Sequence, residues 1–340
     1  MRYTILVSLL TFFLFSSPLQ AKKLFVVTTL STYASIAQAI GGNKIKVVAL
    51  VKGFQDPHFM TPKPSKALIL SKADVFISTG LDLELWAPTL IDKSGNAKIR
   101  SGQIGYVSAS QGIKLLEKPV VFSRSGVGLH IYGNPHFYNS PISGFTIAKN
   151  IAIGLQKNDP KHTAFFQKNL KRFEDTLYKK LYGRKLLRLL GKRVLFRLSQ
   201  SGQIMTFLHK RSYKGKKLIK YAGGWFKIAE KLYNHKVVAY HKNWTYFSHV
   251  FGLKLIDYIE PKPGIPPSPK HVQEVIEKMR LHKIKVIIAA NYYPESKVRH
   301  IAKIVNAKAV ILGLMTHGEN GENDYFKLFD VLLKKITSAF

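Results

Sequence analysis

Cysteine is absent from this sequence of 340 residues. The chain therefore has no disulfide framework, no thiolate ligand for a metal ion, no thiol nucleophile and no cysteine that could carry a lipid. The motifs His-Glu-x-x-His, Gly-x-Ser-x-Gly and Gly-x-x-x-x-Gly-Lys are absent as well. The common zinc-protease, serine-hydrolase and phosphate-loop chemistries thus lack the residues that carry them.

Acidic residues are scarce, with 19 aspartates and glutamates against 53 lysines and arginines and a net charge of +34. A charge of this size is typical of proteins that bind nucleic acid or another anionic surface. It also occurs as a lysine-rich, solvated surface. The basic residues are spread along the chain, apart from concentrations at residues 184–193 and 210–220. We interpret the charge as a solvated surface and expect no nucleic-acid partner, because the protein is predicted to be exported.

Long apolar segments are lacking beyond the amino terminus. There, Arg2 precedes an apolar run at residues 5–15, and small and polar residues follow it up to Ala21. This pattern is typical of a secretory signal peptide, and its apolar run is too short to span a bilayer. We predict a signal peptide at residues 1–21, cleavage after Ala21 and a periplasmic location.

The rest of the chain alternates between short apolar runs and amphipathic segments, with 46% hydrophobic residues overall. Runs typical of strands lie at residues 23–29, 44–51, 75–79, 236–240, 255–259, 286–290 and 309–312, and around Val107. Strands that alternate with helices predict an α/β fold with mostly parallel sheets. Ligands bind beyond the carboxyl ends of such strands. Both halves of the chain show the pattern, so we expect two βα lobes.

The longest helical pattern follows Gly133-Asn134-Pro135-His136. Apolar residues recur at helical spacing from about residue 143 to about residue 181. Asp159-Pro160 marks a kink or a restart inside this segment. Residues 185–236 predict small helices packed on the second half, with a break at Gly191. His136 stands at the head of the long helix, where neighbouring prolines restrict the backbone, and this position suits the junction of two lobes.

Three histidines share one kind of setting. His58 and His241 lie just beyond predicted strands in opposite halves, and His136 lies at the junction. Neutral imidazole is the commonest side-chain ligand for zinc, and three imidazoles with an open fourth position form a known zinc site. A single loop histidine would more often be hydrogen-bonded and structural. Because proline or strand geometry holds all three, we predict them as metal ligands, with His130 and His317 as candidate outer contributors.

Several motifs, in order along nearly the whole mature chain, resemble those of one family. They are Asp56-Pro57-His58 with Pro64-Ser65, Gly80-Leu81-x-Leu83-Glu84-x-Trp86, Gly133-Asn134-Pro135-His136, Tyr240-His241-Lys242-Asn243-Trp244 and Glu260-Pro261-Lys262-Pro263-Gly264. The family is that of the periplasmic metal-binding proteins, of the zinc and manganese type, that serve ABC importers.

The resemblance implies two α/β lobes bridged by a single long helix, with a metal ion in the cleft between them. It also implies delivery to a membrane permease rather than catalysis. His58, His136 and His241 fall on the three histidine ligand positions of the family. We accordingly expect an N-terminal lobe at residues 22–142, a linking helix at 143–182 and a C-terminal lobe at 183–340.

The sequence departs from the family at the fourth ligand. The family often supplies an acidic residue from a Leu-Asp-Pro-like turn, where this chain reads Leu312-Gly313-Leu314-Met315, and Asn291 stands where some relatives carry a glutamate. The long histidine-rich loop of many zinc-uptake members is also missing, because residues 118–132 contain only His130. The candidates for the fourth position are water, Asn291, His317, Glu319 and Asp324.

Three nitrogen ligands favour zinc over manganese, which prefers more oxygen donors. We therefore predict Zn(II) as the transported ligand, with Mn(II) less favoured. The protein is expected to be a monomer whose lobes stay nearly fixed, because one stiff helix limits hinge motion. Imidazole must be deprotonated to bind a metal, so affinity is expected to fall as the pH drops through about 6.5.

Two alternatives from other classes remain open. An exported zinc-dependent hydrolase could use the same three histidines with a metal-activated water, and Asp56 is then the nearest candidate base in their loops. A basic protein that binds an anionic polymer would instead show salt-dependent binding that a chelator does not affect. The resemblance favours transport over both, so we predict a protein that is not an enzyme.

Overall fold

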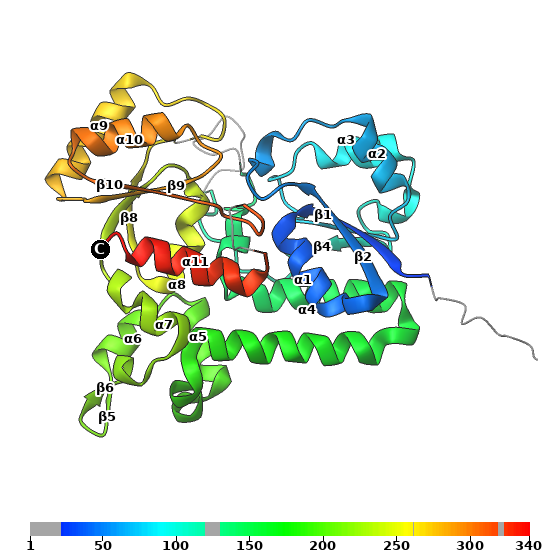
Figure 1. Ribbon diagram of the computed structural model, residues 1–340, viewed down its shortest axis with the longest axis horizontal. Coiled ribbons are helices and arrows are strands. Elements are labelled where there is room, and N and C mark those ends of the chain that lie inside the picture. Colours follow the sequence, from blue (N-terminus) through cyan, green and yellow to red (C-terminus); the bar gives the residue numbers. More distant parts are fainter. Residues whose placement is uncertain (1–21, 120–129, 261, 319–322) are drawn as a thin grey trace, which may run out of the picture.

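Two lobes stand side by side in the computed structural model, which describes residues 22–119, 130–260, 262–318 and 323–340. Each lobe is built on a four-stranded sheet, and a long helix runs beneath both (Figure 1). The predicted fold class is therefore confirmed. The predicted signal peptide, its cleavage site and Glu319 lie outside the described residues. Within the part of the chain that the structure describes, none of the helices combines the length and apolar character needed to cross a membrane.

The sheet of the N-terminal lobe has the strand order β2-β1-β3-β4, and every neighbouring pair is parallel. Its strands are β1 (Leu24–Leu30), β2 (Ile45–Val51), β3 (Val75–Ser78) and β4 (Tyr106–Ser108). The helices between them are α1 (Ser31–Gly41), α2 (Pro64–Ser71) and α3 (Ala87–Ser94). The central strands β1 and β3 are almost wholly buried, and their sequences are accordingly mainly apolar.

The sheet of the C-terminal lobe has the order β10-β9-β7-β8 and is also parallel. Its strands are β7 (Lys236–Ala239), β8 (Lys254–Tyr258), β9 (Val286–Ala290) and β10 (Lys308–Leu312). Its helices are α6 (Ile204–Lys210), α7 (Gly224–Ala229), α8 (Thr245–Phe251), α9 (Pro269–Leu281), α10 (Glu295–Ile304) and α11 (Tyr325–Thr337). An antiparallel hairpin that the sequence did not predict, β5 (Ser212–Tyr213) with β6 (Lys216–Lys217), also belongs to this lobe.

The predicted long helix consists of two helices, α4 (Ser143–Asn158) and α5 (Thr163–Gln200). Asp159 and Pro160 separate them, as the sequence predicted for a restart. α4 packs on α1 and stays with the N-terminal lobe, whereas α5 lies below it and continues into the C-terminal lobe (Figure 1). The helix that links the lobes is therefore α5, while the predicted linking segment 143–182 also includes α4.

Two glycines interrupt α5. Gly183 and Gly191 have φ angles of 70° and 74° with ψ angles of 162° and 157°, a combination that is essentially restricted to glycine. The regular helix that begins at Thr163 therefore ends at Gly183, close to the predicted end, and shorter helical segments follow. Gly183 packs directly on Gly223, because a Cβ at position 183 would lie 2.6 Å from the Gly223 Cα.

The two lobes touch beside α1. Ser31 Oγ, at the start of α1, donates a hydrogen bond of 2.7 Å to the carbonyl oxygen of Thr316. Gly53 approaches the backbone of residues 316–318 so closely that a Cβ there would overlap the Thr316 carbonyl oxygen. The Tyr325 N–H donates to Ser35 Oγ at 2.9 Å. Backbone and small polar groups thus hold the lobes together on this side.

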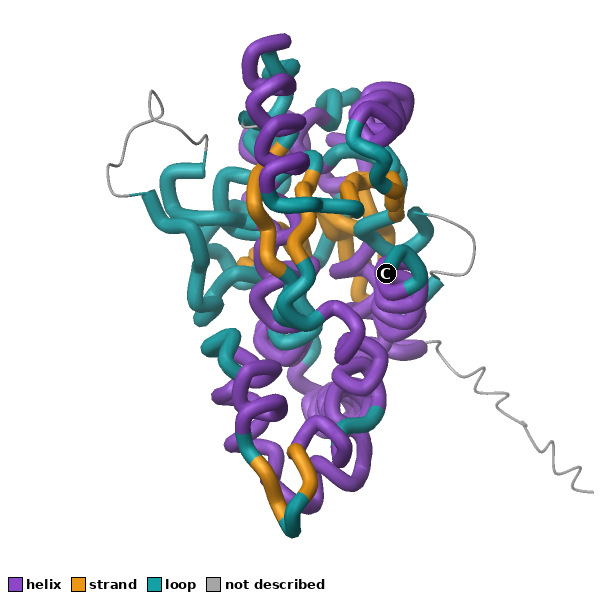
Figure 2. Tube along the Cα trace, turned by 90° about the vertical axis from the view of Figure 1, so that its left-hand side faces the viewer, coloured by secondary structure: helices purple, strands orange, loops and turns teal. Residues whose placement is uncertain are grey.

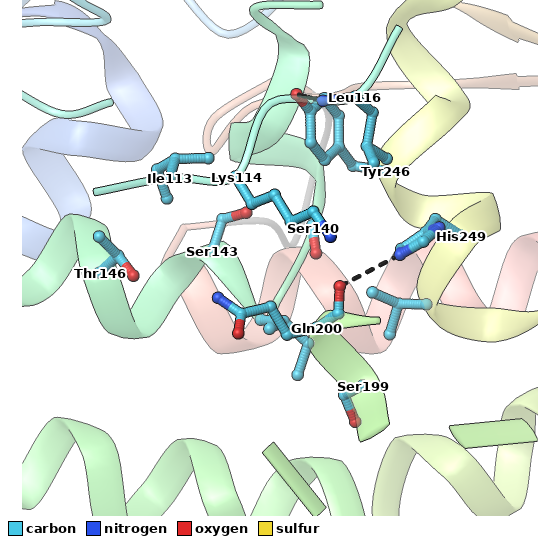
Figure 3. Close-up of a pocket in the computed structure, with 12 residues that line it drawn as sticks. Ile113, Lys114, Leu116, Ser140, Ser143, Thr146, Ser199, Gln200, Tyr246 and His249 are labelled. Carbon is cyan, nitrogen blue, oxygen red and sulfur yellow. Dashed lines mark hydrogen bonds between the residues drawn. The ribbon is translucent and has the colours of Figure 1, made fainter. Parts of the chain in front are cut away.

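A second meeting point lies where α4 begins and α5 ends (Figure 3). Tyr246 of α8 accepts from the Leu116 N–H at 2.9 Å and donates to the Asn134 carbonyl oxygen at 2.6 Å. His249 of the same helix hydrogen-bonds the Gln200 carbonyl oxygen at 3.2 Å. A cavity of about 30 Å³ lies among these segments. Residues from both lobes therefore pack closely around α8.

Candidate metal centre

Four imidazole rings converge between the lobes. His58, His130, His136 and His241 each offer one ring nitrogen, and these four atoms all lie within 4.8 Å of one another. Neighbouring ring centroids are 5.1–5.6 Å apart. The structure thus brings together the three histidines that the sequence singled out, and it adds His130 to them.

Short turns carry three of these rings, and two of these turns lie just beyond strands. His58 lies in a 3-10 turn (Pro57–Phe59) that follows β2, and His241 lies just beyond β7. His136 opens another 3-10 turn (His136–Asn139) immediately before α4. Turns at the carboxyl ends of strands in both parallel sheets therefore contribute to one cluster, as the placement of ligands in such sheets leads us to expect.

The turn that carries His58 is held from two sides. Asp56 Oδ1 accepts from the His58 N–H at 2.9 Å and lies 2.7 Å from His58 Nδ1. Trp86 Nε1 donates to the Pro57 carbonyl oxygen at 2.8 Å. Pro57 restricts the backbone before the histidine. The imidazole is therefore fixed by the carboxylate on one side and by the anchored turn on the other.

His136 and His130 are oriented in the same way. Asn134 Oδ1 accepts from the His136 N–H and lies 2.9 Å from His136 Nδ1. The Asn134 amide also donates to the Lys242 carbonyl oxygen at 2.8 Å, which ties this turn to the opposite lobe. Asp82 Oδ1 lies 3.1 Å from His130 Nδ1. Each ring therefore has an oxygen acceptor at Nδ1.

His241 completes the pattern with the carbonyl oxygen of Glu260, which lies 3.4 Å from His241 Nδ1. The Glu260 carboxyl lies on the same side of the ring, with Oε2 3.7 Å from Nδ1, and burial raises the pKa of Glu260 to about 7. An acceptor at Nδ1 keeps the proton on that nitrogen and leaves the lone pair of Nε2 available. All four rings are thus arranged to present Nε2 as the donor atom.

Burial keeps the inner rings neutral. The Nε2 atoms of His136 and His241 are buried and have no hydrogen-bond partner among the described residues. Burial lowers the pKa of His136 well below its usual value, and the nearby rings of His58 and His241 lower it further. Burial also lowers the pKa of His241 and of His130. Neutral imidazoles with unshared lone pairs are the form that a metal ion requires, so this set of residues fits a metal ion.

Other candidates for the fourth ligand have separate contacts. The Asn291 amide nitrogen donates to the Gly318 carbonyl oxygen at 3.0 Å, whereas Asn291 Oδ1 is buried without a hydrogen-bond partner among the described residues. Asp324 caps α11 by accepting from two backbone N–H groups, and together with His317 it lines a different cavity, beside α1. His130 stands next to the three predicted ligands instead. Its signal in the sequence is its position shortly before the turn that carries His136, but no strand or proline marks His130 itself.

Two parallel-sheet lobes joined by one long helix, with four imidazoles converging between them, define a metal-binding solute-binding protein of the ABC-importer type. The chain belongs to the family described as zinc-uptake complex component A, periplasmic (ZnuA), whose model matches residues 26–180 and 216–339. The resemblance found in the sequence motifs is therefore confirmed. A family of transport components gives no support to the hydrolase alternative.

Related proteins and solved structures agree with this assignment. The manganese ABC transporter substrate-binding lipoprotein PsaA of Streptococcus pneumoniae is 25% identical over 332 residues, which cover 95% of this chain and 91% of PsaA. A zinc-bound deletion mutant of ZnuA aligns with a TM-score of 0.68 and 22% identity, covering 94% of this chain and 98% of its own. FpvC of Pseudomonas aeruginosa, in complex with Mn²⁺, aligns with a TM-score of 0.67 and 21% identity over 94% and 98%. The solved structures confirm the fold, and the bound metals differ among these proteins.

Proposed function

We propose that this protein binds Zn(II) through Nε2 of His58, His130, His136 and His241 and delivers it to the membrane permease of an ABC importer. The orientation of the rings carries the proposal. Each ring has an oxygen acceptor at Nδ1, and the four ligand nitrogens lie within 4.8 Å of one another. Nitrogens bound to a tetrahedral zinc at about 2.0–2.1 Å stand about 3.3 Å apart. The Nε2 atoms of His58 and His130 are 3.3 Å apart.

The chemistry of the donor atoms supports zinc over manganese. The cluster consists of four neutral nitrogens, whereas manganese prefers carboxylate, carbonyl and water oxygens. The nearby carboxylates of Asp56 and Asp82 act on Nδ1 of the rings, on the side away from the shared centre. They raise the basicity of the ligands without taking a coordination position.

Metal titration of the purified protein tests this function. Calorimetry with Zn²⁺ and with Mn²⁺ should show one site per chain, with zinc bound more tightly by at least about tenfold. His136→Ala should abolish measurable zinc binding, and His130→Ala should weaken it by at least about 100-fold if His130 is a ligand. His300→Ala removes an exposed histidine of α10 and is the matched control, because it should bind zinc as the parent protein does.

Three results would contradict the proposal in whole or in part. Zinc affinity that is unchanged in His136→Ala would place the metal elsewhere. Tighter binding of Mn²⁺ than of Zn²⁺ would leave the site in place but reverse the choice of metal. An unchanged affinity in His130→Ala alone would return the fourth position to water or to another residue.

Delivery to a permease implies a location outside the cytoplasm, and the predicted signal peptide supports export. We propose that the mature protein begins after Ala21 and acts as a monomer. Amino-terminal sequencing of the exported protein and its mass in solution check these two points directly.

A further inference from the structure

One part of the C-terminal lobe carries positive charge with no acidic residue nearby in the sequence. No aspartate or glutamate occurs between Asp175 and Glu230, whereas residues 184–220 contain twelve lysines and arginines. Six of them lie in residues 184–197 and six in residues 210–220. The sequence shows these as two separate runs. In the structure both runs lie toward the same end of the molecule, shown at the bottom of Figures 1 and 2.

We call residues 184–220 the basic end. All twelve lysine and arginine residues are exposed. Lys192 forms an ion pair with Asp175, and Lys220 forms one with Glu230. Among the described residues, the other ten form no ion pair. The basic end therefore keeps most of its positive charge unneutralised on the surface.

The basic end is separate from the metal centre. It comprises the later part of α5, helix α6 and the β5–β6 hairpin, and Figure 2 shows the hairpin at the lower tip of the molecule, away from both sheets. The match to the family model stops at residue 180 and resumes at residue 216, so most of the basic end lies outside the part that the family model covers. The basic end therefore takes no direct part in the metal centre.

The surface of the basic end combines charge with exposed apolar groups. The exposed fractions of Val194 and Tyr213 are 45% and 42%. Lys214 Nζ lies 5.6 Å from the centre of the Tyr213 ring; Tyr213 ends β5, and Lys214 follows it in the turn to β6. Tyrosine beside lysine is typical of surfaces that enter the headgroup layer of a bilayer. There the ring contacts apolar groups while the ammonium group stays in the polar region.

We propose that the basic end binds the surface of a membrane that contains anionic phospholipids. Its charges are spread over several elements, which suits an extended array of phosphate groups better than a single small anion. Exposed Tyr213 and Val194 favour a bilayer over a soluble polymer, because a bilayer offers an apolar layer beneath the phosphates. This inference does not depend on metal binding, although an importer's permease would lie in such a membrane.

Co-sedimentation of the full mature protein with lipid vesicles tests the proposal. Vesicles of phosphatidylcholine mixed with phosphatidylglycerol should bind the protein, and vesicles of phosphatidylcholine alone should not. Raising the salt from about 0.1 M to about 1 M shortens the screening length from about 10 Å to about 3 Å and should release it. A soluble polyphosphate serves as the probe for binding to an anionic polymer.

Two variants that each remove four positive charges distinguish the effect of the basic end on vesicle binding from the effect of the overall net charge. The combination Arg188→Gln, Arg193→Gln, Arg197→Gln and Lys216→Gln should weaken vesicle binding by at least about tenfold. The combination Lys270→Gln, Arg280→Gln, Lys303→Gln and Lys308→Gln removes four exposed charges from α9, α10 and β10 and should leave binding nearly unchanged. A third variant, Lys214→Gln with Lys216→Gln and Lys217→Gln, affects only the hairpin region and should give an intermediate loss. Circular dichroism and zinc stoichiometry show whether each variant is folded.

Equal losses in the two fourfold variants would overturn the proposal, because net charge alone would then explain the binding. Binding to polyphosphate without binding to the anionic vesicles would also overturn it and would favour a soluble polymer as the partner. Failure to bind either probe would show that the basic end is a solvated surface, as the sequence first suggested. None of these outcomes bears on the metal centre, which the zinc titration tests separately.

Discussion

The exposed fractions of His136 and His241 are 0% and 1%, so each ring would have to carry a proton without contact with water. In the unfolded chain these histidines titrate near their ordinary pKa of about 6.5. Burial lowers the pKa of both in the folded protein. As the pH falls below about 6.5, the unfolded chain therefore takes up protons that the folded chain does not, and stability falls with pH until the lower pKa values are reached.

We expect the metal-free protein to lose stability between pH 7 and pH 5, by up to about 1.4 kcal/mol for each pH unit and each buried histidine. Urea unfolding at a series of pH values in the presence of a chelator measures this loss. His241→Asn should flatten the dependence, and His300→Asn, which changes an exposed ring, should not. A metal-free protein equally stable at both pH values would contradict the burial argument.

The lowered pKa values also modify the pH expected for metal release. The sequence predicted that affinity falls as the pH drops through about 6.5, the value for a free histidine. Because the pKa values of His130, His136 and His241 are lowered, protons compete for these nitrogens only at lower pH. Burial, which sets this shift, depends on the packing of both lobes and could not be obtained from the positions of the histidines in the sequence.

At the scale of secondary-structure elements, Gly183 and Gly191 allow a direct comparison. Both have positive φ angles, so alanine at either position should cost about 1–3 kcal/mol in backbone strain. At Gly191 a Cβ would meet nothing within 4 Å, whereas at Gly183 it would lie 2.6 Å from the Gly223 Cα. We expect Gly183→Ala to lower the free energy of unfolding clearly more than Gly191→Ala, as urea titration can measure. Equal losses would mean that the chain relaxes freely around Gly223.

The sequence predicted the strands well because β1, β3, β7 and β9 are the central strands of their sheets and consist mainly of apolar residues. It also predicted the restart at Asp159-Pro160 from the chemistry of proline. It could not predict that α4 stays with the N-terminal lobe while α5 crosses to the other, because helical periodicity gives no direction in space. The β5–β6 hairpin was missed because its residues are polar and exposed and show no apolar alternation.

Sequence patterns give no direction in space, and this also explains why His130 was not among the three predicted ligands. Proline and strand ends mark the positions of His58, His136 and His241 in the sequence. His130 reaches the cluster through the contacts of Asp82, which lies far away in the sequence and holds both His130 Nδ1 and the Ile131 N–H. Contacts of this kind depend on the three-dimensional arrangement, so sequence reasoning named His130 only as a candidate outer contributor and not as one of the predicted ligands.

At the scale of the whole molecule, the direct contacts between the lobes support the expectation that they stay nearly fixed. Ser31, Ser35 and Gly53 of the N-terminal lobe contact residues 316–318 and 325 of the C-terminal lobe. Tyr246 bridges the lobes at the other side through Leu116 and Asn134. We therefore expect metal-free and zinc-loaded protein to differ in radius of gyration by less than about 1 Å in small-angle X-ray scattering.

Gly53→Ala should disturb this arrangement, because its Cβ would overlap the Thr316 carbonyl oxygen and force the lobes apart. His58 lies in the N-terminal lobe and His241 in the other, so separation of the lobes moves two of the proposed ligands away from each other. We expect Gly53→Ala to weaken zinc binding by about tenfold or more, since small displacements of ligands are costly in a site of fixed geometry. Gly95→Ala is the control for a strained glycine without a clash, because Gly95 ends α3 with a φ angle of 67° but a Cβ there meets nothing within 4 Å. Equal zinc affinities of the two variants would show that the cleft adjusts to the added methyl group, and the lobes would then have to be regarded as mobile relative to each other.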